Sequence, residues 1–247
     1  MILPEHTQSS SSVRCEWGAS GLAALAPISD VVVIVDVLSF STCIDVVVAR
    51  GARVYPYRWK DESARRYAET IDALCAGPRA EGSYSLSPVS LCDLPRGARL
   101  VLPSPNGSTL TLAAAAYGVR HLIAGSLRNA GAVARWVDAQ RMIDPTLSIA
   151  VIPAGERWPD ETLRPALEDW LGAGAVIARL TGTHSPEAAA AADAFRTHRD
   201  RLEETVRRCS SGQELVARGF ADDVTMASEH DLSECVPSFD GEAYDAL

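Results

Sequence analysis

Short aliphatic runs alternate with longer helical patterns along most of the chain. Runs with the length and β-branching of buried strands lie at 31–35 (VVVIV), 53–57, 98–104, 119–125 and 147–155. Stretches of helical pattern, several closed by glycine, lie at 41–51, 61–77, 106–118 and 129–142. Strands that alternate with helices of this length predict βαβ units.

The last third of the chain predicts more helix than strand. Helical patterns cover 163–180 and 186–208, whereas 211–228 predicts a short helix, a turn and a last strand. The stretch 78–98 predicts a long irregular crossing, and the polar, serine-rich residues 1–12 predict a frayed start. Because near-continuous aliphatic strands are typical of a sheet covered on both faces, we predict one α/β domain over 1–247. It would be a three-layer α/β/α structure with a largely parallel or mixed sheet.

Charge and cysteine usage narrow the classes of function. The 247 residues carry a formal net charge of -9, so a nucleic-acid partner is not expected. Lys60 is the only lysine, which argues against a lysine nucleophile or a P-loop. The six cysteines form no CxxC pair, the start does not resemble a signal peptide, and no apolar run approaches the roughly 20 residues of a membrane span. We therefore expect a cytoplasmic protein with reduced thiols and no membrane partner.

Three strand ends carry polar groups that a simple turn does not need. They are, in chain order, Asp36 with Ser39, Ser41 and Thr42; Asn106 with Gly107, Ser108 and Thr109; and Glu156 with Arg157. In open α/β sheets, ligands bind outside the carboxyl ends of the strands. The first two junctions also open helices, whose N-terminal amides can hold a phosphate. We expect the junctions after Val35 and after Pro105 to converge on one anion pocket with an acidic floor.

Asp36 is the residue that most needs an explanation, because a carboxylate at the end of a buried strand costs desolvation unless it has a partner. A divalent cation between Asp36 and a bound phosphate would supply that partner. The catalytic candidates are Asp36, Asn106 and Glu156; the phosphate-binding candidates are Ser39, Ser41, Thr42, Gly107, Ser108 and Arg157; the candidate ligands of such a cation are Asp36, Glu156 and Asp169. Further acids that could join are Glu81, Glu168, Asp222 and Asp223.

Each of these residues also has a structural interpretation. Ser41, Thr42 and Asn106 can serve as helix caps or turn residues, and Glu156 with Arg157 can form a surface ion pair. Other catalytic schemes do not fit: Leu38 stands where a haloacid-type phosphatase has a second aspartate, no cysteine is followed by arginine six positions on, and there is no GxSxG elbow. Catalysis would therefore rest on carboxylates, hydroxyls and a metal.

At these residues the sequence resembles the 2-phosphosulfolactate phosphatase family. The resemblance runs from about residue 30 to residue 237 and rests on VVIVDVLSFST, on PNGST, on AGERW followed by ALEDWLGAGAVI, and on SSGQELVARGFADDV with CVP. It implies an α/β fold and a magnesium-dependent phosphomonoesterase acting on a small phosphorylated acid, in a pathway like that to coenzyme M. Ser39 departs from the pattern, since the family usually has arginine there, and LSP at 86–88 lacks the family's asparagine. The family's Glu-Gly would match Glu81-Gly82, and Arg157 or Arg128 could replace the missing cation.

The predicted reaction leaves two routes open. A carboxylate either orients the attacking water as a base or attacks phosphorus itself. A non-catalytic protein that binds an anionic metabolite, or a phosphotransferase or isomerase on the same scaffold, are the alternative functions. A homodimer is one option for the assembly.

Overall fold

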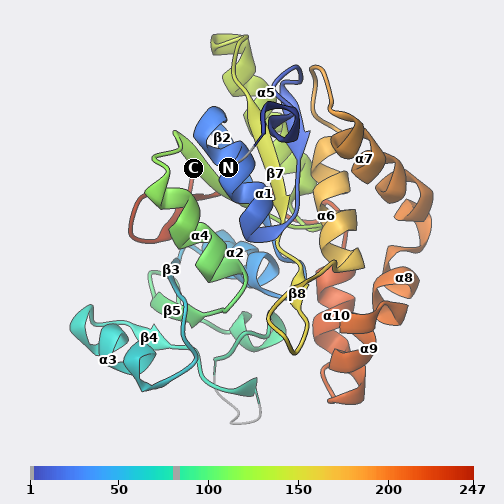
Figure 1. Cartoon of the computed structure of the whole chain (residues 1–247). Helices are drawn as coiled ribbons and strands as arrows, with labels where there is room; N and C mark the ends of the chain where they lie inside the picture. Colours follow the sequence, from blue (N-terminus) through green and yellow to red (C-terminus); the bar gives the residue numbers. More distant parts are fainter. Residues whose placement is uncertain (1–2, 80–83) are drawn as a thin grey trace.

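A computed structural model describes residues 3–79 and 84–247, and a nine-stranded mixed sheet forms its centre (Figure 1). The strands in order across the sheet are β1 (Val13–Cys15), β7 (Ile149–Pro153), β2 (Val31–Val35), β6 (His121–Gly125), β10 (Pro237–Phe239), β11 (Tyr244–Ala246), β3 (Arg53–Tyr57), β5 (Arg99–Pro103) and β4 (Leu74–Cys75). Helices flank the sheet, which confirms the predicted α/β fold class.

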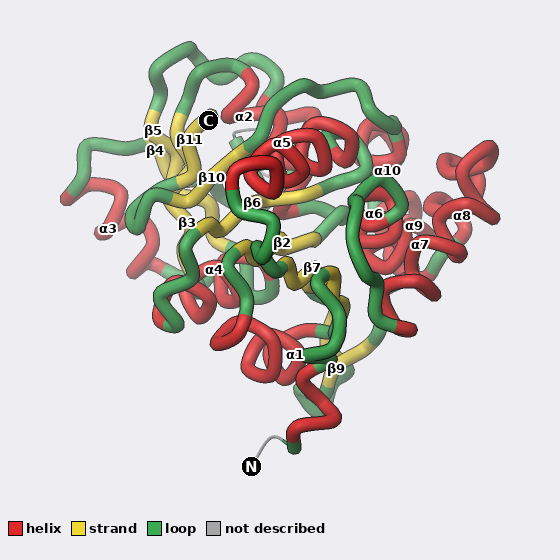
Figure 2. Tube along the Cα trace, turned by 90° about the horizontal axis from the view of Figure 1, so that it is seen from above, coloured by secondary structure: helices red, strands yellow, loops and turns green. Residues whose placement is uncertain are grey.

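The sheet consists of two parallel halves joined by a hairpin. Strands β1, β7, β2 and β6 are mutually parallel, and so are β3, β5 and β4. The hairpin β10–β11 pairs antiparallel with β6 on one side and with β3 on the other. The two halves therefore run in opposite directions, and Figure 2 shows β10 and β11 lying between them. This is the sense in which the sheet is mixed.

Alternate residues of the strands face different helix layers, as the two-residue period of a strand requires. In the first half, Val31, Val33 and Val35 pack with α5 (Ala130–Ile143) and α6 (Leu167–Ile177). Val32 and Ile34 pack on the other face with α1 (Gly18–Leu25) and α4 (Gly107–Ala116). Outside these layers, α7 (Pro186–His198) packs on α6.

The second half is covered in the same way. Val54, Leu100 and Leu102 pack with α2 (Phe40–Ala49), whereas Tyr55 and Val101 face α3 (Glu62–Thr70). Each layer thus buries one set of alternating side chains. None of the helices within residues 3–79 and 84–247 is long and apolar enough to cross a bilayer.

The predicted strand near the end of 211–228 is wrong. The stretch forms α9 (Ser210–Ala217) and α10 (Ala221–Ser228), which follow α8 (Leu202–Arg208). Val224 and Thr225 suggested a strand by their β-branching, but Val224, Ala227 and Ser228 form a helical stripe that is buried. Gly219, with a φ of 87°, separates the two helices.

Other boundaries differ because short elements carry little pattern. The helix expected over 61–77 ends at Thr70, and Leu74–Cys75 forms the edge strand β4. The stretch 163–180 begins with β9 (Leu163–Arg164), paired to β8 (Glu156–Arg157), before α6 starts. The start expected to fray contains a 3-10 helix at Pro4–Thr7, and the Gln8 side chain hydrogen-bonds both the amide and the carbonyl of Cys15.

Candidate active site

Two helix N-termini hold the carboxylate of Asp36, which follows β2. The Phe40 amide donates to Asp36 Oδ1 at 3.1 Å, and the Gly107 amide donates to Oδ2 at 3.0 Å. These are the first residues of α2 and α4, so the positive end of each helix dipole faces the carboxylate. The structure confirms that the junctions after Val35 and after Pro105 meet.

Gly107 allows this close approach because it has no side chain. A Cβ at this position would lie 2.1 Å from Phe40 Cδ1 and 2.8 Å from Asp36 Oδ2. Both distances are shorter than non-bonded contact, so any other residue would push the two helix starts apart. The Asn-Gly pair that suggested a turn is therefore also a packing requirement of the Asp36 site.

The hydroxyls expected to bind phosphate hold the backbone instead. Ser41 Oγ donates to the Asp36 carbonyl at 2.8 Å and accepts from the Asp36 amide at 3.0 Å. Thr42 Oγ1 donates to the Val37 carbonyl at 2.7 Å, and Ser108 Oγ donates to the Leu102 carbonyl at 2.9 Å. All three hydroxyl residues are fully buried. The Gly107 amide is also engaged. The groups expected to bind phosphate therefore bind the backbone and the carboxylate of Asp36 instead.

Asp169 lies behind Asp36 rather than in an open site. Its Oδ1 accepts from the Val37 amide at 2.7 Å and its Oδ2 from the Gly155 amide at 2.9 Å. The residue is 3% exposed. Asp169 thus ties the ends of β2 and β7 together, and its oxygens do not reach the cavity described below.

Glu156 brings a second carboxylate to the same place from the end of β7. Asn106 Nδ2 donates to Glu156 Oε2 at 2.9 Å, which joins the ends of β5 and β7. Asp36, Asn106 and Glu156 all line one cavity of about 180 Å³. The three residues proposed as catalytic from the sequence are therefore neighbours in space.

Three cationic side chains, Lys60, Arg79 and Arg218, also line this cavity, together with Glu214, which pairs with Arg218 at 3.2 Å. Ser39 is on the same wall, and Arg79 Nη2 donates to Ser39 Oγ at 2.8 Å. The cavity therefore combines acids that could bind a cation with bases that could bind an anion.

Arg79 is held firmly in this position. Its guanidinium also donates to the Leu86 carbonyl, and its Nε lies 3.6 Å from Asp223 Oδ2. Asp223 in turn accepts from Ser87 Oγ at 2.5 Å and is 2% exposed. Asp223, one of the further acids considered above, thus positions a cation and lies outside the cavity wall.

The electrostatics of the carboxylates follow from their burial. Burial raises the pKa of Asp36 to about 6, although the amides of Phe40 and Gly107 oppose this shift. Burial, and then the charge of Asp36, raise the pKa of Glu156 to about 7. Burial and the nearby charge of Asp36 also raise the pKa of Asp169. Desolvation therefore makes the ionised form of each of these carboxyl groups more costly than it is in water.

A divalent cation fits this donor set as an open site. Asp36 and Glu156 provide two carboxylates in one cavity, and Mg²⁺ is commonly held by one or two carboxylates together with substrate oxygens and water. Within residues 3–79 and 84–247, no group of three or more His, Cys, Asp or Glu side chains is arranged to enclose a metal. The residues thus suit a metal that is completed by its substrate.

Both arginines considered as replacements for a cation at position 39 lie elsewhere. Arg157 is in the β8–β9 hairpin, pairs with Glu161 at 2.9 Å and is outside the cavity wall. Arg128 pairs with the buried Asp45 and with Glu229. Glu81 and Gly82 lie outside the described residues.

The sequence reasoning missed all three cations of the cavity. Lys60 follows β3, Arg79 lies in the irregular crossing, and Arg218 follows α9, so no local motif links them. The one available signal was that Lys60 is the only lysine of the chain, in a segment directly after a predicted strand.

Comparison with known proteins shows which family the chain resembles. The model of the family described as 2-phosphosulpholactate phosphatase matches residues 22–242, which include the whole cavity. A Carboxydothermus hydrogenoformans protein named "Probable 2-phosphosulfolactate phosphatase" is 33% identical over 215 residues, 83% of this chain and 84% of that protein. A Gloeobacter violaceus protein of the same name is 31% identical over 84% of this chain and 87% of its own. The Methanothermobacter thermautotrophicus "2-phosphosulfolactate phosphatase" is 27% identical over 85% and 87%.

Proposed function

Because this chain belongs to the 2-phosphosulpholactate phosphatase family, we propose that it hydrolyses the phosphate monoester of a small acid at the cavity between Asp36, Glu156 and Lys60. The observation that carries the proposal is the convergence of the Asp36 and Glu156 carboxylates, which follow β2 and β7, with three cationic side chains on one cavity. Carboxylates supply base and metal-binding groups, and the cations compensate an anionic substrate.

The cations indicate a substrate with more than one negative group. Lys60 and Arg218 lie at the mouth, and Arg79 lies deeper beside Ser39. The resemblance leads us to expect an arginine at position 39, and Arg79 brings a guanidinium to the hydroxyl of the serine that stands there. A guanidinium can bind two oxygens of a phosphate, carboxylate or sulfonate. We infer that Arg79 supplies this recognition from another part of the chain.

Magnesium is the metal that we propose for the site, with Asp36 and Glu156 as its protein contacts. Their raised pKa values support this, because a bound cation would offset the desolvation of the ionised carboxylates. Bound there, Mg²⁺ would neutralise charge on the phosphoryl oxygens. Asp169 would orient the strand ends from behind rather than bind the metal.

The side chains of the cavity can carry out hydrolysis by water. Glu156, oriented by Asn106 and with a pKa of about 7, can accept the proton of the attacking water. The new P–O bond forms as the ester P–O bond breaks, and the leaving alcohol oxygen takes a proton. Lys60 can donate that proton, since desolvation and the charge of Arg79 lower its pKa. Asp36 stays fixed by the Phe40 and Gly107 amides throughout.

A direct test is to measure phosphate release from a panel of phosphorylated hydroxy acids, 2-phosphosulfolactate among them, with Mg²⁺ and with a chelator. We expect turnover that requires the metal and falls at least about 100-fold in Asp36→Asn. Glu161→Gln is the matched control, because Glu161 is exposed on the β8–β9 hairpin and lies outside the cavity wall.

Full turnover of the Asp36→Asn enzyme would refute the proposed site. Conversion of the substrate without free phosphate would instead support a phosphotransferase or an isomerase. Binding without any conversion would support the non-catalytic alternative.

A further inference from the structure

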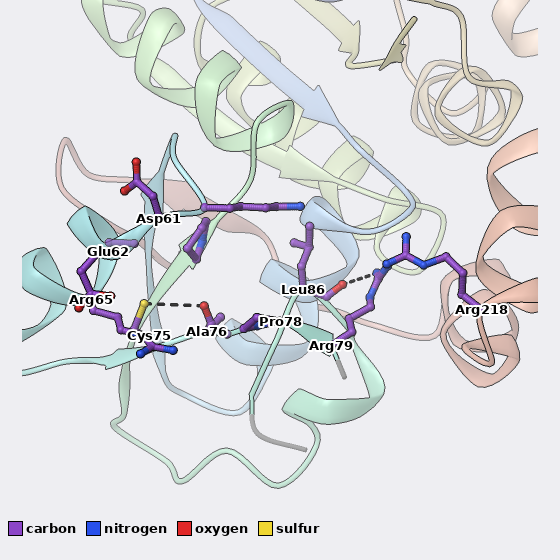
Figure 3. A pocket seen from close by; sticks show the side chains of 13 residues that line it. Asp61, Glu62, Arg65, Cys75, Ala76, Pro78, Arg79, Leu86 and Arg218 are labelled. Atoms are coloured by element: carbon purple, nitrogen blue, oxygen red, sulfur yellow. Dashed lines mark hydrogen bonds between the residues drawn. The ribbon is translucent and has the colours of Figure 1, made fainter. Parts of the chain in front are cut away.

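A second and larger cavity opens beside the first. Its volume is about 480 Å³, and it shares Lys60, Arg79, Leu86 and Arg218 with the wall of the first cavity (Figure 3). The two cavities are therefore adjacent, and these side chains form part of both walls. A molecule whose phosphate lies near Asp36 would enter the second cavity past these side chains.

The wall of the second cavity changes character along its length. Arg79 and Arg218 lie at one end in Figure 3, and Arg65 lies at the other. Between the two ends, the wall includes Pro78 and Leu86, together with smaller apolar groups. The middle of the cavity thus offers apolar contact, in contrast to the acids, amide and hydroxyls around Asp36.

The charged groups at the far end have mixed sign. Arg65 lies there with Asp61 and Glu62, and all three residues are exposed. Asp61 is already engaged as the cap of α3, since its Oδ1 accepts from the Ser63 amide at 2.9 Å. These groups form a hydrated rim and do not define a receptor for a single charge.

The volumes indicate the size of the substrate. A cavity of about 180 Å³ accommodates a phosphate with an adjacent acidic group, whereas binding sites for larger organic ligands span roughly 300–1,000 Å³. The second cavity, at about 480 Å³, falls in that larger range. A three-carbon acid held at the carboxylates would leave it filled with water.

We propose that the second cavity binds the alcohol part of the substrate, and that this part has an apolar body longer than three carbons. The inference rests on the proposed function for the position of the phosphate. The ester then places its phosphate between Asp36 and Glu156 and its acidic group at Arg79. Its apolar body lies against Leu86 and Pro78.

Cys75 offers a way to close the second cavity without touching the first. It lies on the edge strand β4, is partly buried, and lines only the larger cavity of the two. Phenylalanine has a favourable β-propensity, so Cys75→Phe can keep the strand while filling the cavity. Cys75→Ala is the matched control, because it removes the thiol and leaves the space open.

The test measures the binding of alkylphosphonates from propyl to hexyl in the presence of Mg²⁺, by titration calorimetry. In the wild-type protein we expect affinity to rise about fourfold with each methylene, because each one leaves water for the apolar wall. Cys75→Phe should abolish this rise and leave propylphosphonate affinity within about twofold. Cys75→Ala should retain the rise.

Equal affinity for all chain lengths in the wild-type protein, or an undiminished rise in Cys75→Phe, would overturn the inference. The absence of measurable binding by any of the phosphonates would overturn it as well. A chain-length dependence in a protein that releases no phosphate would leave the inference standing and refute only the proposed hydrolysis. Phosphate release from esters at equal kcat/KM for short and long alcohols would support the proposed hydrolysis and overturn the inference about the second cavity.

Discussion

Glu156→Gln removes one of the carboxylates that line the cavity while preserving the shape of the side chain. The glutamine oxygen can still accept the hydrogen bond from Asn106, which measures 2.9 Å in the wild-type protein. The substitution removes a carboxyl group whose pKa is raised to about 7 by burial and by the charge of Asp36. Its effect on stability should therefore depend on pH.

The sign follows from the direction of the shift. A carboxyl group with a raised pKa binds its proton more tightly in the folded state, so its ionisation destabilises the fold. The penalty is absent below the ordinary pKa of 4.5, grows as the pH rises, and is complete above about 7. The difference between these two values corresponds to about 3 kcal/mol.

Urea unfolding in the presence of a chelator, at pH 5 and at pH 8, measures this penalty. Between these conditions, the wild-type protein should lose about 2.5 kcal/mol more of its free energy of unfolding than Glu156→Gln loses, because a small part of the penalty is already present at pH 5. Glu161→Gln should follow the wild-type protein. An equal pH dependence in wild-type and Glu156→Gln proteins would refute the reasoning that Glu156 is a desolvated acid beside Asp36.

Three further outcomes are expected. Gly107→Ala should cost about 1–3 kcal/mol of stability in urea unfolding, and most of the phosphatase activity, because its Cβ would overlap Phe40. Gly97→Ala should also lose stability, about 1–2 kcal/mol, because Gly97 has a φ of 77°, but its new Cβ has open space and activity should be retained. Arg79→Met should raise KM about tenfold or more, with a smaller effect on kcat. Arg79→Lys should raise KM less, because it keeps the positive charge. An unchanged KM in Arg79→Met would show that Arg79 does not bind the substrate. In the pH profile of kcat/KM, activity should rise with pH as Glu156 ionises, with a midpoint at or below about 7 when Mg²⁺ is bound, and the Glu156→Gln enzyme should lack this rise.

The sequence predicted the strands whose pattern is local. β2, β3, β5, β6 and β7 lie within one or two residues of the expected runs, because each is a largely buried segment of five residues and all except β3 are mainly aliphatic. The three-residue strands β1, β10 and β11 carry no such pattern. β10 and β11 exist because each pairs with a strand of a different half of the sheet, which is a property of the whole fold.

The residues of the candidate site also fall into two groups, those with a local signal in the sequence and those without one. Asp36, Asn106 and Glu156 were identifiable because each directly follows a predicted strand, where α/β folds bind ligands. Lys60, Arg79 and Arg218 were not, because only the folded chain brings a loop, an irregular crossing and a helix end together. The hydroxyls of Ser41, Thr42 and Ser108 were misassigned, since a hydroxyl at a helix start can bond its own backbone as readily as a ligand.

A crystal structure with Mg²⁺ and phosphate bound would test the central claim, that this cavity joins metal and phosphate between the carboxylates and the cations. We predict Mg²⁺ about 2.1 Å from a carboxylate oxygen of Asp36. A phosphate oxygen should share that metal and contact Arg79 or Lys60. Magnesium and phosphate bound elsewhere, with the cavity between Asp36 and Arg79 holding only water, would contradict the account.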